Sequence, residues 1–156
     1  MKILIFLFSL VFILTSCTKK WNPVNHDNSE NEFIRVSVPQ PIIKDGKQAA
    51  WSPDGTQIAY TGWSDDSQQD IYIASHDGSN VQQITSESSI DNHPFWSPDG
   101  RTIGFSSNRV NGTDYHVFII SLHDQETVQM CPDTLCVQAG DWSPNGRNIV
   151  FDGHFY

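Results

Sequence analysis

One pentapeptide occurs three times in this chain and sets the scale of its fold. The copies begin at Trp51, Trp96 and Trp142, and they read Trp-Ser-Pro-Asp-Gly twice and Trp-Ser-Pro-Asn-Gly once. The tryptophans are 45 and then 46 residues apart. A period of this length indicates a repeat architecture, in which each copy is one supersecondary unit that buries its core against its neighbours.

Each pentapeptide is expected to form a tight turn between two strands. Proline fixes φ at the second turn position, Asp or Asn is tolerated at the third, and glycine takes the fourth, where a left-handed backbone is often needed. Because Asn meets the same need as Asp, we interpret the motif as structural rather than catalytic. The repeat residues are Trp51, Pro53, Gly55, Trp96, Pro98, Gly100, Trp142, Pro144 and Gly146.

Alternating residues around each turn predict the other strands of the unit. An Ile and an aromatic residue, two positions apart, follow every turn: Ile58 and Tyr60, Ile103 and Phe105, Ile149 and Phe151. Third strands are predicted at residues 70–73 and 116–119, and fourth strands at 81–85 and 127–131. Four short antiparallel strands per repeat predict an all-β fold, a β-propeller of four-stranded blades.

These motifs resemble the TolB-like β-propeller family. Blades of that family carry Pro-x-Trp-Ser-Pro-Asp-Gly, then an Ile-x-aromatic strand and Asp-Ile-Tyr, and residues 93–100 and 70–72 match these patterns closely. The resemblance covers about residues 48–156. It implies the propeller fold but not one function, because members include periplasmic TolB, lipoproteins, and the propeller parts of peptidases and lyases.

The sequence holds only about two and a half blades, at residues 48–85, 93–131 and 139–156. A closed ring needs at least four blades, and an open stack exposes sheet edges. We therefore expect a fragment of a longer protein, with assembly of several copies or a decayed gene product as the alternatives. The third blade is the least typical, because Ala-Gly-Asp at 139–141 replaces His-Pro-Phe at 93–95.

The N-terminus has the pattern of an export signal. Lys2 precedes an apolar run from Ile3 to Leu14, which is too short to span a bilayer but suits a secretory signal. The small residues before Cys17 resemble a bacterial lipobox, so we expect a signal peptide over residues 1–16 and lipidation of Cys17. A plain signal peptide with an incidental cysteine is the alternative.

A lipidated Cys17 predicts a protein that is exported and lipid-anchored to a bacterial membrane, facing the periplasm or the cell exterior. Residues 17–32 are polar and rich in Asn, which predicts a flexible tether before a partial propeller over residues 33–156. Residues 33–38 alternate as a leading strand.

Charge and cysteine usage narrow the classes of partner. Asp and Glu number 18 against 9 Lys and Arg, for a net charge of −9, which argues against nucleic acid. Cys131 and Cys136 are expected to form a disulfide in an oxidising compartment. The alternative, a zinc site, lacks a second pair of ligands.

In a four-stranded meander, the loops after the second and fourth strands lie at the same end, and this end is the expected binding face. It carries Trp63, Asp65, Asp66, Asp91, His93 and Arg109. Calcium binding by Asp65, Asp66 and Asp70 is an alternative to a solvated hairpin tip, but the spacing misses the known calcium-loop pattern. His93 is read as structural rather than as a metal ligand, and we predict no metal and no cofactor.

Known enzyme signatures are missing from the sequence: it has no Gly-x-Ser-x-Gly elbow, no His-Glu-x-x-His, no phosphate loop and no dinucleotide fingerprint. We expect a membrane-anchored, non-enzymatic module that presents its loop face to a protein or glycan of the cell envelope. The alternative is the propeller portion of a larger exported hydrolase or lyase, a peptidase or polysaccharide lyase, whose catalytic part lies outside this sequence.

Overall fold

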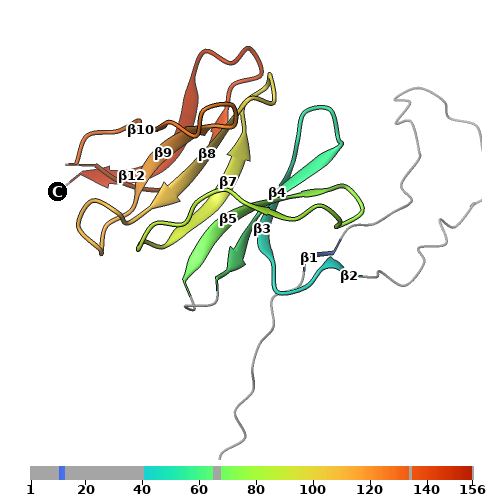
Figure 1. Cartoon of the computed structure of the whole chain (residues 1–156). Helices are drawn as coiled ribbons and strands as arrows, with labels where there is room; N and C mark the ends of the chain where they lie inside the picture. Colours follow the sequence, from blue (N-terminus) through green and yellow to red (C-terminus); the bar gives the residue numbers. More distant parts are fainter. Residues whose placement is uncertain (1–10, 13–40, 65–67, 134, 156) are drawn as a thin grey trace, which may run out of the picture.

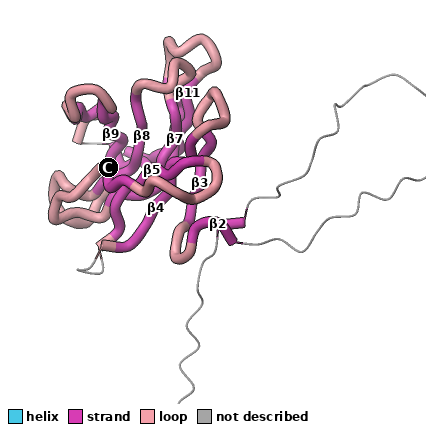
Figure 2. Tube along the Cα trace, turned by 45° about the vertical axis from the view of Figure 1, so that its right-hand side comes forward, coloured by secondary structure: helices cyan, strands magenta, loops and turns pink. Residues whose placement is uncertain are grey.

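The computed structural model describes residues 11–12, 41–64, 68–133 and 135–155, and this part of the chain consists of strands, turns and loops (Figures 1 and 2). No helix that is long and apolar enough to cross a membrane occurs among these residues. The predicted leading strand at 33–38, the tether and most of the predicted signal segment lie outside them.

Two four-stranded antiparallel sheets follow one another along the chain. The first blade consists of β3 (Lys47–Trp51), β4 (Gln57–Trp63), β5 (Gln69–Ser75) and β6 (Gln82–Gln83), paired in that order. The second blade repeats the arrangement with β7 (Asp91–Trp96), β8 (Thr102–Ser107), β9 (His116–Ser121) and β10 (Thr127–Gln129). The all-β fold with four-stranded propeller blades is thereby confirmed.

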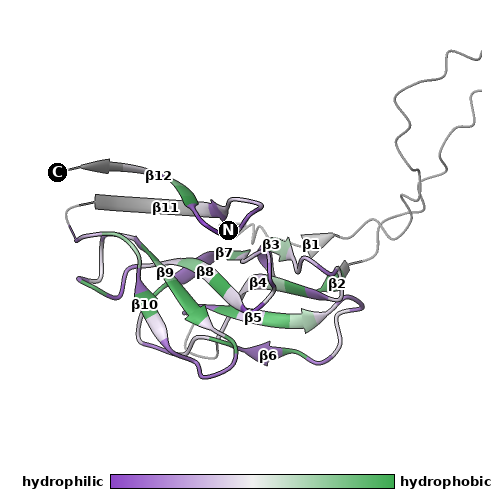
Figure 3. Cartoon of the chain, turned by 90° about the horizontal axis from the view of Figure 1, so that it is seen from above, coloured by the Kyte–Doolittle hydropathy of each residue, from purple (hydrophilic) through white to green (hydrophobic). Residues whose placement is uncertain are grey.

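Two further pairs of strands complete the described structure. A half blade is formed by β11 (Leu135–Trp142) and β12 (Ile149–Phe155), which are antiparallel. Before the first blade, β1 (Val11–Phe12) pairs with β2 (Pro41–Ile43), so two residues of the predicted signal segment lie against β2. The first strands of the three units, β3, β7 and β11, lie close together, whereas β6 and β10 lie on the outside (Figure 3).

The three pentapeptides build the same turn. Gly55 N donates to Ser52 O at 2.9 Å, and the Asp54 carboxylate accepts from Ser52 Oγ at 2.6 Å and from Thr56 N at 3.0 Å. The glycine has φ of 71° in the first turn and 69° in the other two, a conformation that favours glycine. In the third turn the Asn145 side-chain oxygen accepts from Ser143 Oγ and Arg147 N, the same two bonds, which explains why Asn replaces Asp there.

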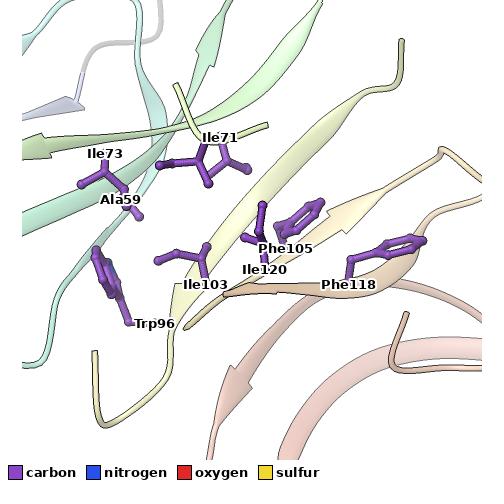
Figure 4. Packing of buried hydrophobic residues seen from close by; sticks show 9 residues of the cluster. Ala59, Ile71, Ile73, Trp96, Ile103, Phe105, Phe118 and Ile120 are labelled. Carbon is purple, nitrogen blue, oxygen red and sulfur yellow. The ribbon is translucent and has the colours of Figure 1, made fainter. Parts of the chain in front are cut away.

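The two complete blades pack through one apolar core. Ala59, Ile71 and Ile73 of the first blade face residues of the second blade across the interface in Figure 4, namely Trp96, Ile103, Phe105, Phe118 and Ile120. Trp96 is only 7% exposed, and its Nε1 donates to the Ala50 carbonyl of the first blade at 3.2 Å. The equivalent Trp51 is 48% exposed. The same residue type therefore joins two blades at one repeat and faces solvent at another.

This contrast between Trp96 and Trp51 gives a matched test of blade packing. Replacing Trp96 by Phe removes buried ring area and the bond to the Ala50 carbonyl, and we expect the free energy of unfolding to fall by about 1–3 kcal/mol. Trp51→Phe should change it by less than about 0.5 kcal/mol, as for an exposed site. Urea unfolding of the full chain, followed by far-UV circular dichroism, measures both. Equal losses in the two variants would contradict the packing described.

Candidate binding face

The loops of each blade divide into two ends, as expected for a meander. His76 N donates to Thr56 O at 2.9 Å, which places the β5–β6 turn beside the first pentapeptide turn. At the opposite end, Asn108 N donates to Ile90 O at 3.4 Å, so the β8–β9 loop lies beside the segment that enters β7. The second end is the predicted binding face, called the loop end below. Asp65 and Asp66 lie outside the described residues.

Asp91 and Arg109 are brought together at the loop end, but inside the fold. Asp91 is fully buried, and its Oδ2 lies 2.8 Å from Arg109 Nη2 in an ion pair. The other carboxylate oxygen accepts from Ser107 Oγ at 2.5 Å and from Ser89 Oγ at 3.0 Å. The Arg109 guanidinium also lies over the rings of Phe105 and Phe118, at 5.2 and 4.9 Å from their centroids. Both charges are thus engaged by their own blade, and removing the Arg109 guanidinium would leave the fully buried Asp91 carboxylate without its cation.

Three buried residues of the second blade are an Asp, a Ser and a His, the residue types of hydrolase triads. Their hydrogen bonding differs from that of a triad. Asp91, Ser107 and His116 lie in one cross-strand row on β7, β8 and β9, and all three are fully buried. Ser107 Oγ donates to the Asp91 carboxylate rather than to the imidazole. A nucleophilic serine needs a histidine as its base and a substrate within reach. This row is therefore a structural network.

Asp70 is a second buried carboxylate at this end, although the sequence predicted that it lies at a solvated hairpin tip. It is 2% exposed and accepts from Thr85 Oγ1 at 3.3 Å and from Gln83 Nε2 at 3.2 Å. Burial raises the pKa of the Asp70 carboxyl, and the negative charge of Asp91 raises it further. The structure thus corrects the solvated-tip reading for Asp70, because tertiary packing of strand β5 encloses its side chain.

Backbone irregularities recur at the same position of each first strand. The pairing register shifts between Lys47 and Ala50 in β3, and between Asn92 and Phe95 in β7. Within these bulges Gln48 and His93 each have φ of 53°, which is unusual for residues other than glycine. Both residues stand three positions before the repeat tryptophan, and a third register shift occurs between Gln138 and Gly140 in β11. The bulges were not predicted from the sequence.

His93 and Gln48 bond to each other across the two blades. Gln48 Oε1 accepts from Thr61 Oγ1 at 2.8 Å and from His93 N at 3.3 Å, so the amide nitrogen faces the imidazole. That nitrogen lies 2.7 Å from His93 Nε2, and His93 Nδ1 lies 2.9 Å from Asn92 Oδ1. The contact with Asn92 Oδ1 assigns the proton of the neutral imidazole to Nδ1. This leaves Nε2 as the acceptor, and it is the ring nitrogen nearer to the Gln48 amide, at 2.7 Å against 3.2 Å for Nδ1.

The surroundings of His93 also favour its neutral form. Burial lowers the pKa of the imidazole, the positive charge of Lys47 lowers it further, and Asp152 acts in the opposite direction. Protonation would place two donors, the imidazolium N–H and the Gln48 amide, against each other. His93 is therefore best described as one half of a bond between blades.

This geometry predicts a pH dependence of stability. With its folded-state pKa lowered, His93 binds a proton more readily in the unfolded chain, so its contribution is fully present above the ordinary histidine pKa of about 6.5 and is lost as the pH falls below it. We expect His93→Gln to flatten the fall in unfolding free energy between pH 7.5 and about pH 5. The exposed His76, changed to Gln, is the control and should keep the slope of the parent. An unchanged slope in His93→Gln would contradict the assignment.

Trp63 is the predicted face residue that the structure leaves open. It ends β4, is 49% exposed, and has the Lys47 ammonium over its ring at 5.1 Å from the centroid. Lys47 begins β3, one strand away. Lys47 was not predicted as a residue of this face. The signal that could have found it is the difference between the repeats, since the second repeat has Asn92 at the position of Lys47.

Cys131 has a structural partner inside the second blade. Its buried sulfur accepts from Val117 N at 3.3 Å, and in the first blade Thr85 Oγ1 accepts from the equivalent Ile71 N at 3.0 Å. The side chain of Cys136 lies outside the described residues, so the disulfide between Cys131 and Cys136 stays a prediction. The same holds for lipidation of Cys17.

Two hollows lie at the end of the molecule opposite the loop end, between successive pentapeptide turns. They have volumes of about 400 and 330 Å³ and are lined mainly by the Ser, Pro and Asp or Asn residues of the turns. The Asp54 and Asp99 carboxylates in these turns already accept hydrogen bonds within the motif. Among the described residues, no group of three or more His, Cys, Asp or Glu side chains is placed to hold a metal ion.

Residues 44–154 match the TolB beta propeller domain. The chain belongs to this family. It is 37% identical over 59 residues to the Tol-Pal system protein TolB of Alcanivorax borkumensis, which covers 38% of this chain and 14% of that protein. It is 30% identical over 106 residues to the uncharacterized peptidase YuxL of Bacillus subtilis, covering 64% of this chain and 16% of that one.

A solved structure supports the same assignment. The structure of a putative TolB from Agrobacterium tumefaciens superposes with a TM-score of 0.66 at 25% identity, over 75% of this chain and 42% of that one. The resemblance to TolB-like propellers is thereby confirmed. The chain spans less than half the length of each of these three proteins.

Proposed function

We propose that this chain is a non-enzymatic binding module, lipid-anchored at Cys17, that presents its loop end to a protein or glycan of the bacterial cell envelope. Membership of the TolB propeller family supports a propeller whose function lies in its loops. The apolar segment that ends before Cys17 supports export and anchoring.

The observation that supports the binding role is that two charged residues at the loop end are paired within the fold, whereas an aromatic residue there is exposed. Asp91 and Arg109 pair with each other, and the Asp91 carboxylate is fully buried. His93 is held neutral by the neighbouring blade. Trp63, by contrast, is half exposed, and tryptophan is enriched at protein interfaces. Such a surface favours recognition over catalysis.

One relative is named as a peptidase, which supports the alternative of a propeller attached to a hydrolase. In that alternative the loop end would guide substrates to a catalytic part outside the matched region. The buried Asp91–Ser107–His116 row supports the binding role for the part that is present, because its serine is bonded to the carboxylate.

Site-specific photocrosslinking in cells tests the binding role. A benzoylphenylalanine at position 63 of the full chain should give one discrete adduct in the envelope fraction, and the same residue at position 101, in a turn at the opposite end, should not. Mass spectrometry of the adduct identifies a protein partner or shows attached glycan. Absence of any adduct at 63, or equal adducts at 63 and 101, would contradict a binding face at the loop end.

The anchor is tested by metabolic labelling with a palmitate analogue. We expect the full chain to take up the label and to fractionate with membranes, and Cys17→Ser to lose both properties. Cys131→Ser is the control, because that sulfur is buried inside the second blade, and it should label like the parent. Label retained in Cys17→Ser would overturn the proposed anchor.

A further inference from the structure

Lys47 and Trp63 form a pair at the loop end of the first blade that its architecture does not require. In the repeat, the counterparts of Lys47 and Trp63 in the second blade are Asn92 and Asn108. The register agrees, since Lys47 pairs with Thr61 and Asn92 with the equivalent Ser106. The second blade thus builds the same strand ends without a cation and without an aromatic ring.

The side chains of the second-blade counterparts form hydrogen bonds within their blade, whereas among the described residues the Lys47 and Trp63 side chains contact each other. Asn92 Oδ1 bonds to His93, and Asn108 Oδ1 accepts from Ile90 N at 2.8 Å. Among the described residues, the one ion pair joins Arg109 and Asp91, so Lys47 has no carboxylate partner in that part of the chain. Its ammonium group instead lies over the Trp63 ring. A half-exposed tryptophan beside an ammonium group is a surface with unused binding capacity.

The bulge at Gln48 fixes where this pair lies. Gln48 follows Lys47 directly and is held at φ of 53° by its bonds to Thr61 and His93. A bulge re-aims the neighbouring side chains of its strand, and backbone held in a sparsely populated conformation is often found at functional sites. The position of Lys47 is therefore set by the bond between the two blades.

Lys47 and Trp63 together offer one positive charge and one aromatic ring. The polar side chains around them, Gln48, Thr61 and His93, already use their donors and acceptors on each other. A sugar presents many hydroxyl groups and needs several free donors and acceptors. A peptide with a carboxylate next to an apolar side chain needs one cation and one apolar surface, which matches this pair.

We propose that Lys47 and Trp63 form a subsite for an acidic peptide segment, in which a carboxylate binds the Lys47 ammonium and an adjacent apolar side chain packs on Trp63. This proposal rests on the binding function proposed above and names its ligand class. The net charge of −9 disfavours acidic ligands over the surface as a whole, and the Asp152 carboxylate acts on the same His93 as Lys47 does. The attraction for a carboxylate at this place therefore depends on the Lys47 ammonium alone.

The test uses the full chain in detergent micelles with ¹⁵N-labelled tryptophan, titrated with the peptide Gly-Phe-Asp-Phe-Asp-Gly and its twin Gly-Phe-Asn-Phe-Asn-Gly. The Trp63 indole signal should shift when the acidic peptide is added. The chain should bind the acidic peptide about two- to fivefold more tightly than the twin, the difference expected of one exposed charge pair. Lys47→Gln should abolish that preference, and Lys47→Arg should keep it. Arg101→Gln, at the opposite end, should leave it unchanged.

Three results would overturn the proposal. The first is equal binding of both peptides by the parent chain. The second is a preference for the acidic peptide that survives in Lys47→Gln. The third is tighter, Lys47-dependent binding of trigalacturonic acid than of the acidic peptide, which would assign the subsite to an acidic glycan. If the peptide fails while the crosslinked adduct at position 63 persists, the ligand class is wrong and the binding function stands; if both fail, the binding function fails as well.

Discussion

The fold depends on packing between sheets, because each propeller sheet carries apolar side chains on both faces and cannot be stable alone. In the first blade Ala59 faces the second blade, whereas its neighbours Ile58 and Tyr60 face the other way, toward β2. Burial between sheets is the main source of stability for such units. Trp96 joins the two blades in two ways, because its ring lies in the shared core and its indole N–H donates to the Ala50 carbonyl of the preceding blade.

The loop end follows from that packing. With the blades side by side, Gln48 of one bulge meets His93 of the next, and Thr61 supplies the hydroxyl that orients the amide. Buried charge is paired in the same region, through Asp91 and Arg109. This arrangement leaves Trp63 at the surface, with the Lys47 ammonium over its ring. The proposed binding role therefore depends on the contact between blades.

Much of the fold could be predicted because the repeat encodes local geometry. The turns, the second strands and the third strands follow from Pro, Gly and alternating apolar residues, which act within a few positions. The fourth strands were predicted at 81–85 and 127–131, and the strands observed are shorter, Gln82–Gln83 and Thr127–Gln129. The backbone N–H groups of Ile84 and Met130 still donate to the Ile71 and Val117 carbonyls of the third strands. An outer strand at a sheet edge has a neighbour on one side only, so its pairing depends less on its own pattern.

The site was harder to predict because its partners are distant in sequence. Arg109 meets Asp91 across 18 residues, and His93 meets Gln48 across 45, and neither contact leaves a local pattern. A signal was nevertheless present, since Gln48 and His93 share the third position before the repeat tryptophan. Alignment of the repeats against each other also separates Lys47 and Trp63, which differ between blades, from the residues that both blades require.

Solvent exchange of the tryptophan indole protons, measured by NMR on the full chain, tests the central claim that blade packing buries one tryptophan and leaves the loop-end tryptophan open. We expect slow exchange for the Trp96 indole, which donates to Ala50 O, and fast exchange for the half-exposed Trp63 indole. Fast exchange at Trp96 would contradict the contact between blades, and protection of Trp63 in the chain alone would contradict an open binding face.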